Sequence, residues 1–588
     1  MKNTDENSKS IWKKSWKGPR SLLIWFILLT VAAFIVVFCF GLGPAIPMPQ
    51  LAAFSLICAI GIALAVILMV AFIHWLCCWR NFRRFLWGLA CLVMLIALFY
   101  AEEDWRGWHA WQKFKHEWEA KGEKFDFASF VPQPVPDDQN FALTPIVASA
   151  WEAELDKNGH QIQPPKKNVV NRLEMTVSYN YDSPTNGSGY WAEGTKTDLK
   201  AWQEYYRTLA ETTNVFPVAP QPQTPATDVL LALSKYDSAI EELRQASQMP
   251  YSRFPLNYNT DHPFDTLLPH LAGLRNPSRV LQLRAIAELQ NGQSEKALED
   301  IKLSLHLADS IRTEPILISH LVRFAVVEIT LQPIWEGLVE HKWSDAQLAE
   351  LERELGKLDF LADFEFSMRG ERACGIEAID YMRRHRNYRE SFRFLFSSND
   401  DNSNDWRDRV RAAGFYLMPD GWFYQNELAI AQMHQQWLLP MANAKQQLVL
   451  PKIARKSDGF TKSWKSTPQN FFARMFLPTI GAAIRKSCRE QISVDLAQVA
   501  CALERYRLAH GKYPESLDAL EPQFITKLPH DIINGQPLHY RRTADSQFAL
   551  YSVGWNEKDD GGVVGYERPG SIMPSFELGD WVWRHPSK

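Results

Sequence analysis

The sequence predicts a membrane-anchored α+β protein with three transmembrane helices, a mainly α-helical ectodomain and a small C-terminal α+β domain. Residues 21–101 contain only three charged side chains, whereas residues 196–467 repeat apolar positions at helical spacing and residues 468–588 combine a long helix with strand-like segments. With 46% hydrophobic residues and a net charge of −3, the 588-residue chain is not expected to be disordered. Its 8 cysteines are too few for a disulfide scaffold.

Three runs without Asp, Glu, Lys or Arg are long enough to cross a bilayer, namely residues 21–42, 51–78 and 85–101. Because about 20 apolar residues span a membrane, the third run is at the short limit. A cleaved signal peptide is the alternative interpretation of the first run, since a basic tail precedes it. Its apolar stretch is too long, no small-residue cleavage site follows and two further runs come next, so we expect it to remain as a span.

The positions of Lys and Arg predict the orientation of these spans. The tail, residues 1–20, carries six of them, the loop 43–50 carries none and the loop 79–84 carries three. Basic loops remain in the cytoplasm, so the N-terminus is expected there and the chain from Glu102 onward outside it. Residues 85–588 hold 55 basic and 65 acidic side chains, and such an acidic ectodomain argues against a nucleic-acid partner.

Many of the 22 tryptophans lie near the ends of the spans, where an indole ring suits the boundary between headgroups and hydrocarbon. The expected membrane-interface residues are Trp12, Trp16, Trp75, Trp79, Trp105, Trp108 and Trp111. The last three belong to residues 102–130, where aromatic side chains recur every three or four positions and predict a juxtamembrane amphipathic helix. We favour packing of this aromatic stripe on the ectodomain; the alternative is an interfacial helix in the outer headgroup layer.

Residues 131–195 are expected to form a Pro-rich linker and a small β-hairpin. Four prolines between positions 132 and 145 favour extended backbone. Apolar and polar side chains then alternate over residues 173–181, and a turn signal at residues 183–187 precedes Tyr190.

Residues 196–467 predict helices, the first capped by Thr197 and another running from Asp228 to Gln248. In residues 283–308, Gly292 and Ala297 lie between two apolar helical faces. This spacing resembles the turn and the small packing residue of a tetratricopeptide helical hairpin. The resemblance implies stacked antiparallel helices with a surface that binds protein segments.

Residues 468–588 begin with a long helix that Gly511 is expected to cap, because glycine tolerates the left-handed conformation at that position. Cys488 and Cys501 fall thirteen residues apart on this helix, about 20 Å at 1.5 Å per residue, which is too far for a disulfide. A short helix at residues 516–520 and a turn at Asn534-Gly535 follow. The turn introduces residues 537–542, which are expected to pair with residues 547–553 as antiparallel strands.

The C-terminal sequence resembles that of the globular domain of type II secretion pseudopilins of the G type. The matched blocks are residues 503–507, 511–514, 528–531, 535–538, 551–554 and 560–562. The chain departs from that family in having no leader and processing site directly before an apolar helix. The family also binds calcium, but Ala549 stands where a main carboxylate ligand is expected. Asp559 and Asp560 are weak calcium candidates, and solvated turn residues are the favoured interpretation.

Other residue patterns give no catalytic or cofactor-binding site. The sequence lacks the G-x-S-x-G, Walker A, H-E-x-x-H and C-x-x-C motifs. A loop from Asp400 starts like a calcium loop but has Arg411 where a bidentate Glu is needed. A basic run from Arg383 to Arg393 is expected to be a solvated face paired with nearby carboxylates, and contact with anionic headgroups or an acidic partner is the alternative. His320 and Glu328 are expected to be a structural pair.

The whole chain also resembles uncharacterised bacterial multi-span membrane proteins that share the E-E-D-W-R-G segment at residues 102–107. We therefore expect an inner-membrane protein whose extracytoplasmic domain binds or scaffolds a protein partner in the cell envelope or in secretion. An extracytoplasmic hydrolase-like enzyme and a membrane sensor are the alternatives. The sensor is disfavoured because only a 20-residue tail and a short loop face the cytoplasm.

Overall fold

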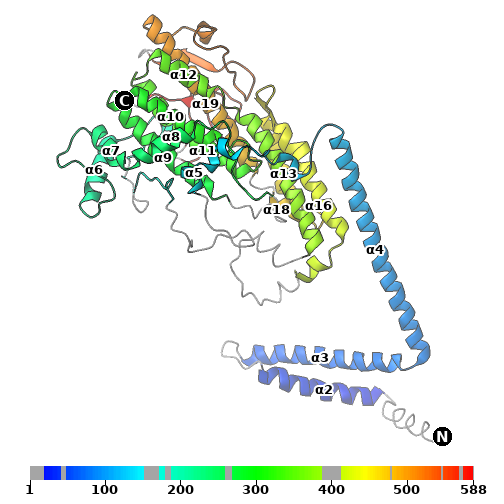
Figure 1. Cartoon of the computed structure of the whole chain (residues 1–588). Helices are drawn as coiled ribbons and strands as arrows, with labels where there is room; N and C mark the ends of the chain where they lie inside the picture. The colour runs from blue at the N-terminus through cyan, green and yellow to red at the C-terminus, as the bar shows by residue number, and fades with distance from the viewer. Residues whose placement is uncertain are drawn as a thin grey trace. The chain divides into compact units, whose positions relative to one another are not determined.

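The structure is a computed structural model that describes residues 19–40, 48–150, 171–178, 184, 187–258, 268–386, 412–476, 480–543, 547–568, 574–575 and 577–586. The chain divides into two compact units, Met1–Glu102 and Glu103–Lys588, and helices predominate (Figure 1).

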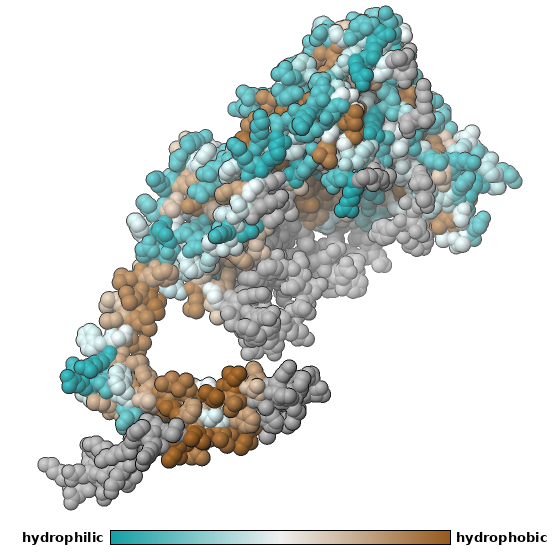
Figure 2. Space-filling view, turned by 180° about the vertical axis from the view of Figure 1, so that it is seen from behind, coloured by the Kyte–Doolittle hydropathy of each residue, from teal (hydrophilic) through white to brown (hydrophobic). Residues whose placement is uncertain are grey.

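The first unit contains the predicted spans as helices α2 (Pro19–Phe40), α3 (Met48–Leu76) and the first part of α4 (Trp79–Glu119). Helices α2 and α3 pack on each other. At 1.5 Å per residue, 22 and 29 residues reach about 33 and 44 Å, enough to cross the hydrocarbon layer. Apolar side chains cover the surface of these helices (Figure 2). By length and composition, the chain is a membrane protein.

Helix α11 (Leu317–Val339) is also long and apolar enough to cross a membrane. However, 61% of its apolar window is buried inside the second unit, where it packs against helices α9, α10 and α19. It also carries the buried ionisable side chains Arg323 and Glu336. We therefore assign the spans to α2, α3 and α4, and α11 to the core of the second unit.

The second unit begins inside α4, where the E-E-D-W-R-G segment holds the start of α16 (Asp420–Met433). The Asp104 carboxylate accepts a hydrogen bond of 2.7 Å from the Gly421 N–H, and the Glu103 Oε2 accepts one of 2.7 Å from the Trp422 indole. A Cβ atom on Gly107 would lie 2.1 Å from the Gly421 carbonyl oxygen, so only glycine permits this approach. These three residues of the segment thus form a clamp on α16, which we call the α4–α16 clamp.

The aromatic stripe of α4 packs on the second unit, as favoured, but only over its last part. Trp111 is 4% exposed and lies against Phe114 and Phe125, so its expected place at the membrane interface is wrong. Burial against other aromatic rings removes it from any lipid contact. Trp75, Trp79, Trp105 and Trp108 are exposed in the structure, whereas Trp12 and Trp16 lie outside the described residues.

Helices make up most of the remaining second unit. They are α6 (Leu199–Ala210), α7 (Pro225–Leu233), α8 (Asp237–Ala246), α9 (His270–Gln290), α10 (Ser294–Asp309), α12 (Asp345–Leu355), α13 (Phe360–His385), α17 (Pro451–Ser463), α18 (Phe471–Phe476) and α19 (Ile480–His510). Short turns lie at Phe127–Phe130, Asp137–Gln139, Phe141–Leu143, Pro145–Ala148, Trp191–Glu193, Ser234–Tyr236, His434–Leu438, Leu439–Met441 and Leu517–Leu520. The expected hairpin of α9 and α10 forms, with Gly292 at φ +71° in its turn and Ala297 fully buried.

Three local expectations are corrected. The first cap belongs to Asp198, whose carboxylate accepts from two backbone N–H groups of α6, and not to Thr197. A 3₁₀ turn at Ser234–Tyr236 divides the expected helix at 228–248 into α7 and α8. The Pro-rich segment is not a free linker, because its apolar side chains, such as Phe141, are buried in the helical core.

The small hairpin at residues 173–190 is also not seen in the described part of that segment. Leu173 and Met175 are buried, as the alternation predicts, yet residues 171–178 form no strand. The Thr176 N–H donates to the Tyr236 hydroxyl at 3.1 Å, so the segment packs on helix termini instead of a partner strand. The predicted turn lies mostly outside the described residues.

The C-terminal elements form largely as predicted. Gly511 follows α19 at φ +72°, and β3 (His539–Arg542) pairs antiparallel with β4 (Phe548–Ser552), His539 opposite Tyr551. A further strand, β5 (Trp581–Trp583), pairs with β4 to give the order β3-β4-β5. A two-stranded sheet of β1 (Ala442–Asn443) and β2 (Leu448–Val449) lies earlier in the chain.

Helix α19 runs through the main core, where it packs against α11, α12 and α13 on the helical body and against β5. Cys488 and Cys501 on this helix are buried free thiols, as expected. The core is therefore continuous between the helical body and the C-terminal strands.

Candidate binding groove

A groove of about 510 Å³ opens between the ends of α7, α8, α9 and α10. It is lined by Leu230, Asp237, Ile240, Glu241, Arg244, Arg284, Glu288, Gln293, Glu295, Lys296 and Glu299. Helical spacing gathers these side chains, because residues three or four apart share one face. On α8 the positions 237, 241 and 244 follow this rule, and on α9 so do 284 and 288. The tight turn at Gly292 brings α10 alongside as the opposite wall.

A buried carboxylate holds two of the groove's cations in place. Asp300 is fully buried on α10 and accepts hydrogen bonds from the Arg244 Nη2 at 2.8 Å and the Arg284 Nε at 2.9 Å. Burial raises the pKa of the Asp300 carboxyl, while the two guanidinium groups act in the opposite direction. Arg284 also pairs with Asp237 at the rim. Both arginines are therefore fixed by carboxylates of the protein itself.

Glu288 lies on the floor of the groove and is only 2% exposed. Its Oε1 is 3.5 Å from the Arg284 Nη2, and its Oε2 has no hydrogen-bond partner among the described residues. Burial, followed by the nearby Asp300 carboxylate, raises the pKa of Glu288 to about 8. Burial therefore favours the protonated form of this carboxyl, since charging it costs desolvation that only a strong partner offsets.

The rim of the groove is acidic and partly exposed. Glu241 accepts from the Arg244 Nη1 at 2.8 Å, Glu295 from the Gln347 Nε2 at 2.9 Å, and Glu299 from the Lys302 Nζ at 3.0 Å. Among the described residues that line the groove there is no His, Cys, Ser or Thr. The lining thus offers carboxyl groups for binding, and its candidate nucleophiles are limited to Lys296 and those carboxylates.

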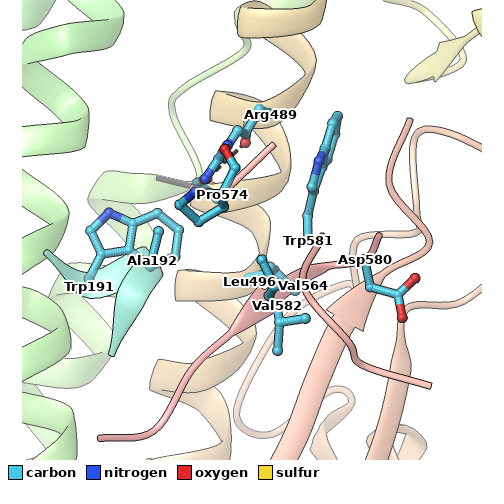
Figure 3. Close-up of a pocket in the computed structure, with 10 residues that line it drawn as sticks. Trp191, Ala192, Arg489, Leu496, Val564, Pro574, Asp580, Trp581 and Val582 are labelled. Atoms are coloured by element: carbon cyan, nitrogen blue, oxygen red, sulfur yellow. Dashed lines mark hydrogen bonds between the residues drawn. The ribbon is translucent and has the colours of Figure 1, made fainter. Parts of the chain in front are cut away.

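A second, much smaller cavity of about 20 Å³ lies where the C-terminus meets the body (Figure 3). Trp191 and Ala192 come from the turn after the Pro-rich segment, Arg489 from α19, and Asp580 and Trp581 from the C-terminal strand region. The Arg489 Nη1 donates to the Pro574 carbonyl at 3.4 Å. This volume has room for about one water molecule, so it is not a ligand site.

The sequence-predicted calcium candidates lie in the turn after β4. Asp559 accepts from the Tyr551 hydroxyl at 3.0 Å and from the Gly561 N–H at 2.9 Å, and Asp560 accepts from the Asn556 side chain at 2.7 Å. The described residues contain no group of three or more His, Cys, Asp or Glu side chains placed to hold a metal. Both carboxylates serve the turn, and calcium binding there stays a prediction.

The remaining candidate residues do not come together. Arg383 pairs with Asp380 at 2.6 Å, as a solvated and paired face predicts, and Arg386 pairs with Asp420. The end of this basic run and the loop from Asp400 to Arg411 lie outside the described residues.

His320 and Glu328 have separate partners. The His320 Nε2 bonds to the Glu314 carbonyl at 2.9 Å, and burial lowers the pKa of His320 to about 4. Glu328 instead accepts from the Tyr190 hydroxyl at 2.7 Å. The two side chains do not form one site.

The sequence interpretation missed the groove because its residues resemble surface ion pairs of helices. One signal was present: Asp300 falls three residues after the buried Ala297, on the core-facing side of α10, where a carboxylate requires a cationic partner. Compared with known proteins, the chain matches no protein-family model, no curated protein and no solved structure.

Proposed function

We propose that this chain is a membrane-anchored binding or scaffolding protein of the bacterial cell envelope, and that its ectodomain holds a segment of a protein partner in the groove between α7 and α10. The observation that carries the proposal is the groove itself. Its volume of about 510 Å³ lies within the range of roughly 300–1,000 Å³ that binding sites occupy. Helical hairpins commonly present such surfaces to polypeptide segments.

The pairing of charges within the groove supports binding over catalysis. The Arg244 and Arg284 guanidinium groups are held by Asp300, so the lining is preorganised at no cost to an incoming partner. A hydrolase would need an activated nucleophile or water beside a general base, whereas three rim carboxylates that could act as that base already pair with arginine or lysine, as Asp237 does with Arg284. The enzyme and the sensor are the alternative functions, and the crosslinking experiment distinguishes the enzyme from a binding protein.

The finer features of the proposal rest on the sequence. The Lys and Arg of the N-terminal tail and second loop support an inner-membrane protein with a cytoplasmic N-terminus and an extracytoplasmic ectodomain. The α9–α10 hairpin supports a tetratricopeptide-like body. The order of α19, β3 and β4 supports a pseudopilin-like domain at the C-terminus, with a link to secretion or to the envelope.

Photo-crosslinking in intact cells tests the binding function. A photo-reactive amino acid is placed at Glu241 or Lys296 in the groove, and at the exposed Glu211 beyond α6 as the matched control. We expect the groove positions to trap a discrete polypeptide that the control position does not trap. Identical products from all three positions, or none from the groove, would contradict the proposal, and turnover of a small molecule would then favour the enzyme.

Thiol labelling tests the orientation. Cys374 is a poor probe because it is 7% exposed and burial raises the pKa of its thiol. We therefore use a Glu211→Cys variant, with the exposed Cys77 and Cys78 as internal controls on the opposite side. A membrane-impermeant maleimide should label position 211 in spheroplasts and the two native cysteines only after lysis. The reverse pattern would refute the proposed orientation.

A further inference from the structure

Among the described lining residues of the groove, Glu288 and Arg244 hold a buried polar atom without a hydrogen-bond partner, and Glu288 is the acidic one of the two. It is 2% exposed, it lines the floor of a hollow of about 510 Å³, and its Oε2 has no hydrogen-bond partner in the described structure. Unpartnered buried carboxyl oxygens are uncommon, because each forgoes the hydrogen bonds that it had in water. A donor that enters the groove would complete this group.

The geometry favours a primary ammonium over a guanidinium as that donor. The Oε1 of Glu288 already faces the Arg284 Nη2 at 3.5 Å, which leaves one oxygen for a ligand. A guanidinium binds best through two parallel bonds to both oxygens of a carboxylate, whereas a lysine ammonium is a compact charge that makes single contacts. Five of the eleven lining residues are acidic and three are basic, so the net charge of the lining favours a cation over an anion.

We propose that the groove recognises a lysine side chain of the partner segment, whose ammonium group binds the Glu288 carboxylate. This inference rests on the proposed binding function and names the chemistry of its partner. The ammonium keeps its three protons, and the proton that leaves the Glu288 carboxyl is released to solvent. Binding therefore releases up to one proton per lysine bound, and affinity rises with pH until Glu288 is ionised.

The charges around Glu288 set this titration. They lie on three helices: Asp237, Glu241 and Arg244 on α8, Arg284 on α9, and Lys296, Glu299 and Asp300 on α10. Burial, with the Asp300 carboxylate acting in the same direction, raises the pKa of Glu288 to about 8, while Arg284, Lys296 and Arg244 act in the opposite direction. A lysine ammonium adds one more positive charge, so it lowers the pKa and drives the release of the proton.

The test uses the full-length protein in nanodiscs and three acetylated, amidated peptides of the pattern X-Ala-X-Ala-X, with X as lysine, arginine or norleucine. Binding is measured by fluorescence anisotropy between pH 6 and pH 9. Proton release is measured by calorimetry in two buffers of different ionisation enthalpy. The variants are Glu288→Gln, which keeps the shape of the neutral carboxyl, and Glu211→Gln, a control outside the groove. Thermal unfolding verifies that both variants fold.

We expect the lysine peptide to bind most tightly, to release a proton below pH 8, and to lose about ten-fold or more in affinity in Glu288→Gln while Glu211→Gln has no effect. Equal binding of the lysine and arginine peptides, or an equal loss in both variants, would overturn the lysine assignment in favour of general charge attraction. If no peptide binds but the photo-crosslinks form from the groove, the lysine assignment fails and the binding function stands. If the crosslinks also fail, both proposals fall.

Discussion

Gly107→Ala is expected to open the α4–α16 clamp. The added Cβ atom would lie 2.1 Å from the Gly421 carbonyl oxygen and 2.6 Å from the Gly421 Cα. Ordinary contacts of a Cβ are about 3.4 Å or longer, so the two backbones must separate by roughly 1 Å. A backbone cannot turn aside as the tip of a flexible side chain can. The separation stretches the 2.7 Å bonds that Asp104 and Glu103 accept from Gly421 and Trp422.

The expected cost follows from these two effects. Overpacking costs about 1–3 kcal/mol, and each hydrogen bond to a charged group contributes about 1.5–3 kcal/mol when intact. Because the bonds weaken but are not all lost, we expect a total of about 3 kcal/mol. If the free energy of the local opening falls by about 3 kcal/mol, amide exchange through that opening becomes about 100-fold faster.

The assay is hydrogen exchange of the full-length protein in nanodiscs, followed in the peptide that contains Gly421 and Trp422. The matched control is Gly459→Ala, a helical glycine at which a Cβ would meet nothing within 4 Å. We expect about 100-fold faster exchange at the start of α16 in Gly107→Ala and no acceleration in the control. Equal exchange in the two variants would refute the reasoning that this close approach holds the clamp together.

Three further predictions concern stability. Asp300→Ala leaves Arg244 and Arg284 without their buried partner and should lower the free energy of unfolding in urea by about 3–5 kcal/mol. The control is Asp345→Ala, which removes an exposed carboxylate that pairs with Arg505 and should cost less than about 1 kcal/mol. Equal costs in the two variants would contradict the role of burial. Burial raises the pKa of Asp495 to about 7, so the folded state binds this proton more tightly than the unfolded state, and the stability of the wild-type protein falls as the pH rises from about 4 through 7. Asp495→Asn should lose this dependence. If the free energy of unfolding changes equally in the two proteins between pH 5 and pH 8.5, Asp495 is not its source. Trp335→Phe removes the 2.7 Å hydrogen bond that the indole donates to the Arg584 carbonyl and should lower the free energy of unfolding by about 1–3 kcal/mol. Hydrogen exchange at β5 should become faster. Unchanged exchange there would show that other contacts hold that strand.

The membrane segments could be predicted from the sequence because the property that defines them is local. An uninterrupted apolar run has a single stable environment whatever the remainder of the chain does. Two further features are local in the same sense. Gly511 has a φ of +72° because it ends one helix, and a nearby turn brings β3 and β4 together. Periodicity also identified the α9–α10 hairpin.

Sequence patterns failed where a distant partner decides the outcome. The alternation at residues 173–178 marks one buried face correctly, but a strand needs a partner, and the Tyr236 hydroxyl takes the place of one. Trp111 has the same local setting as Trp108, yet Phe125 covers the first and leaves the second exposed. Helix α11 is apolar enough for a membrane and is kept from it by the protein core that surrounds it.

The membrane anchor, the helical nature of the second unit and the local turns near its C-terminus follow from residues that are neighbours along the chain. The groove and the clamp depend on how distant segments pack together. Arg244 and Asp300 are 56 residues apart, and Asp104 and Gly421 are 317 residues apart. Charge pairs and close backbone contacts depend on distances of a few ångströms in space, and no periodicity along the chain encodes which distant residues will share them.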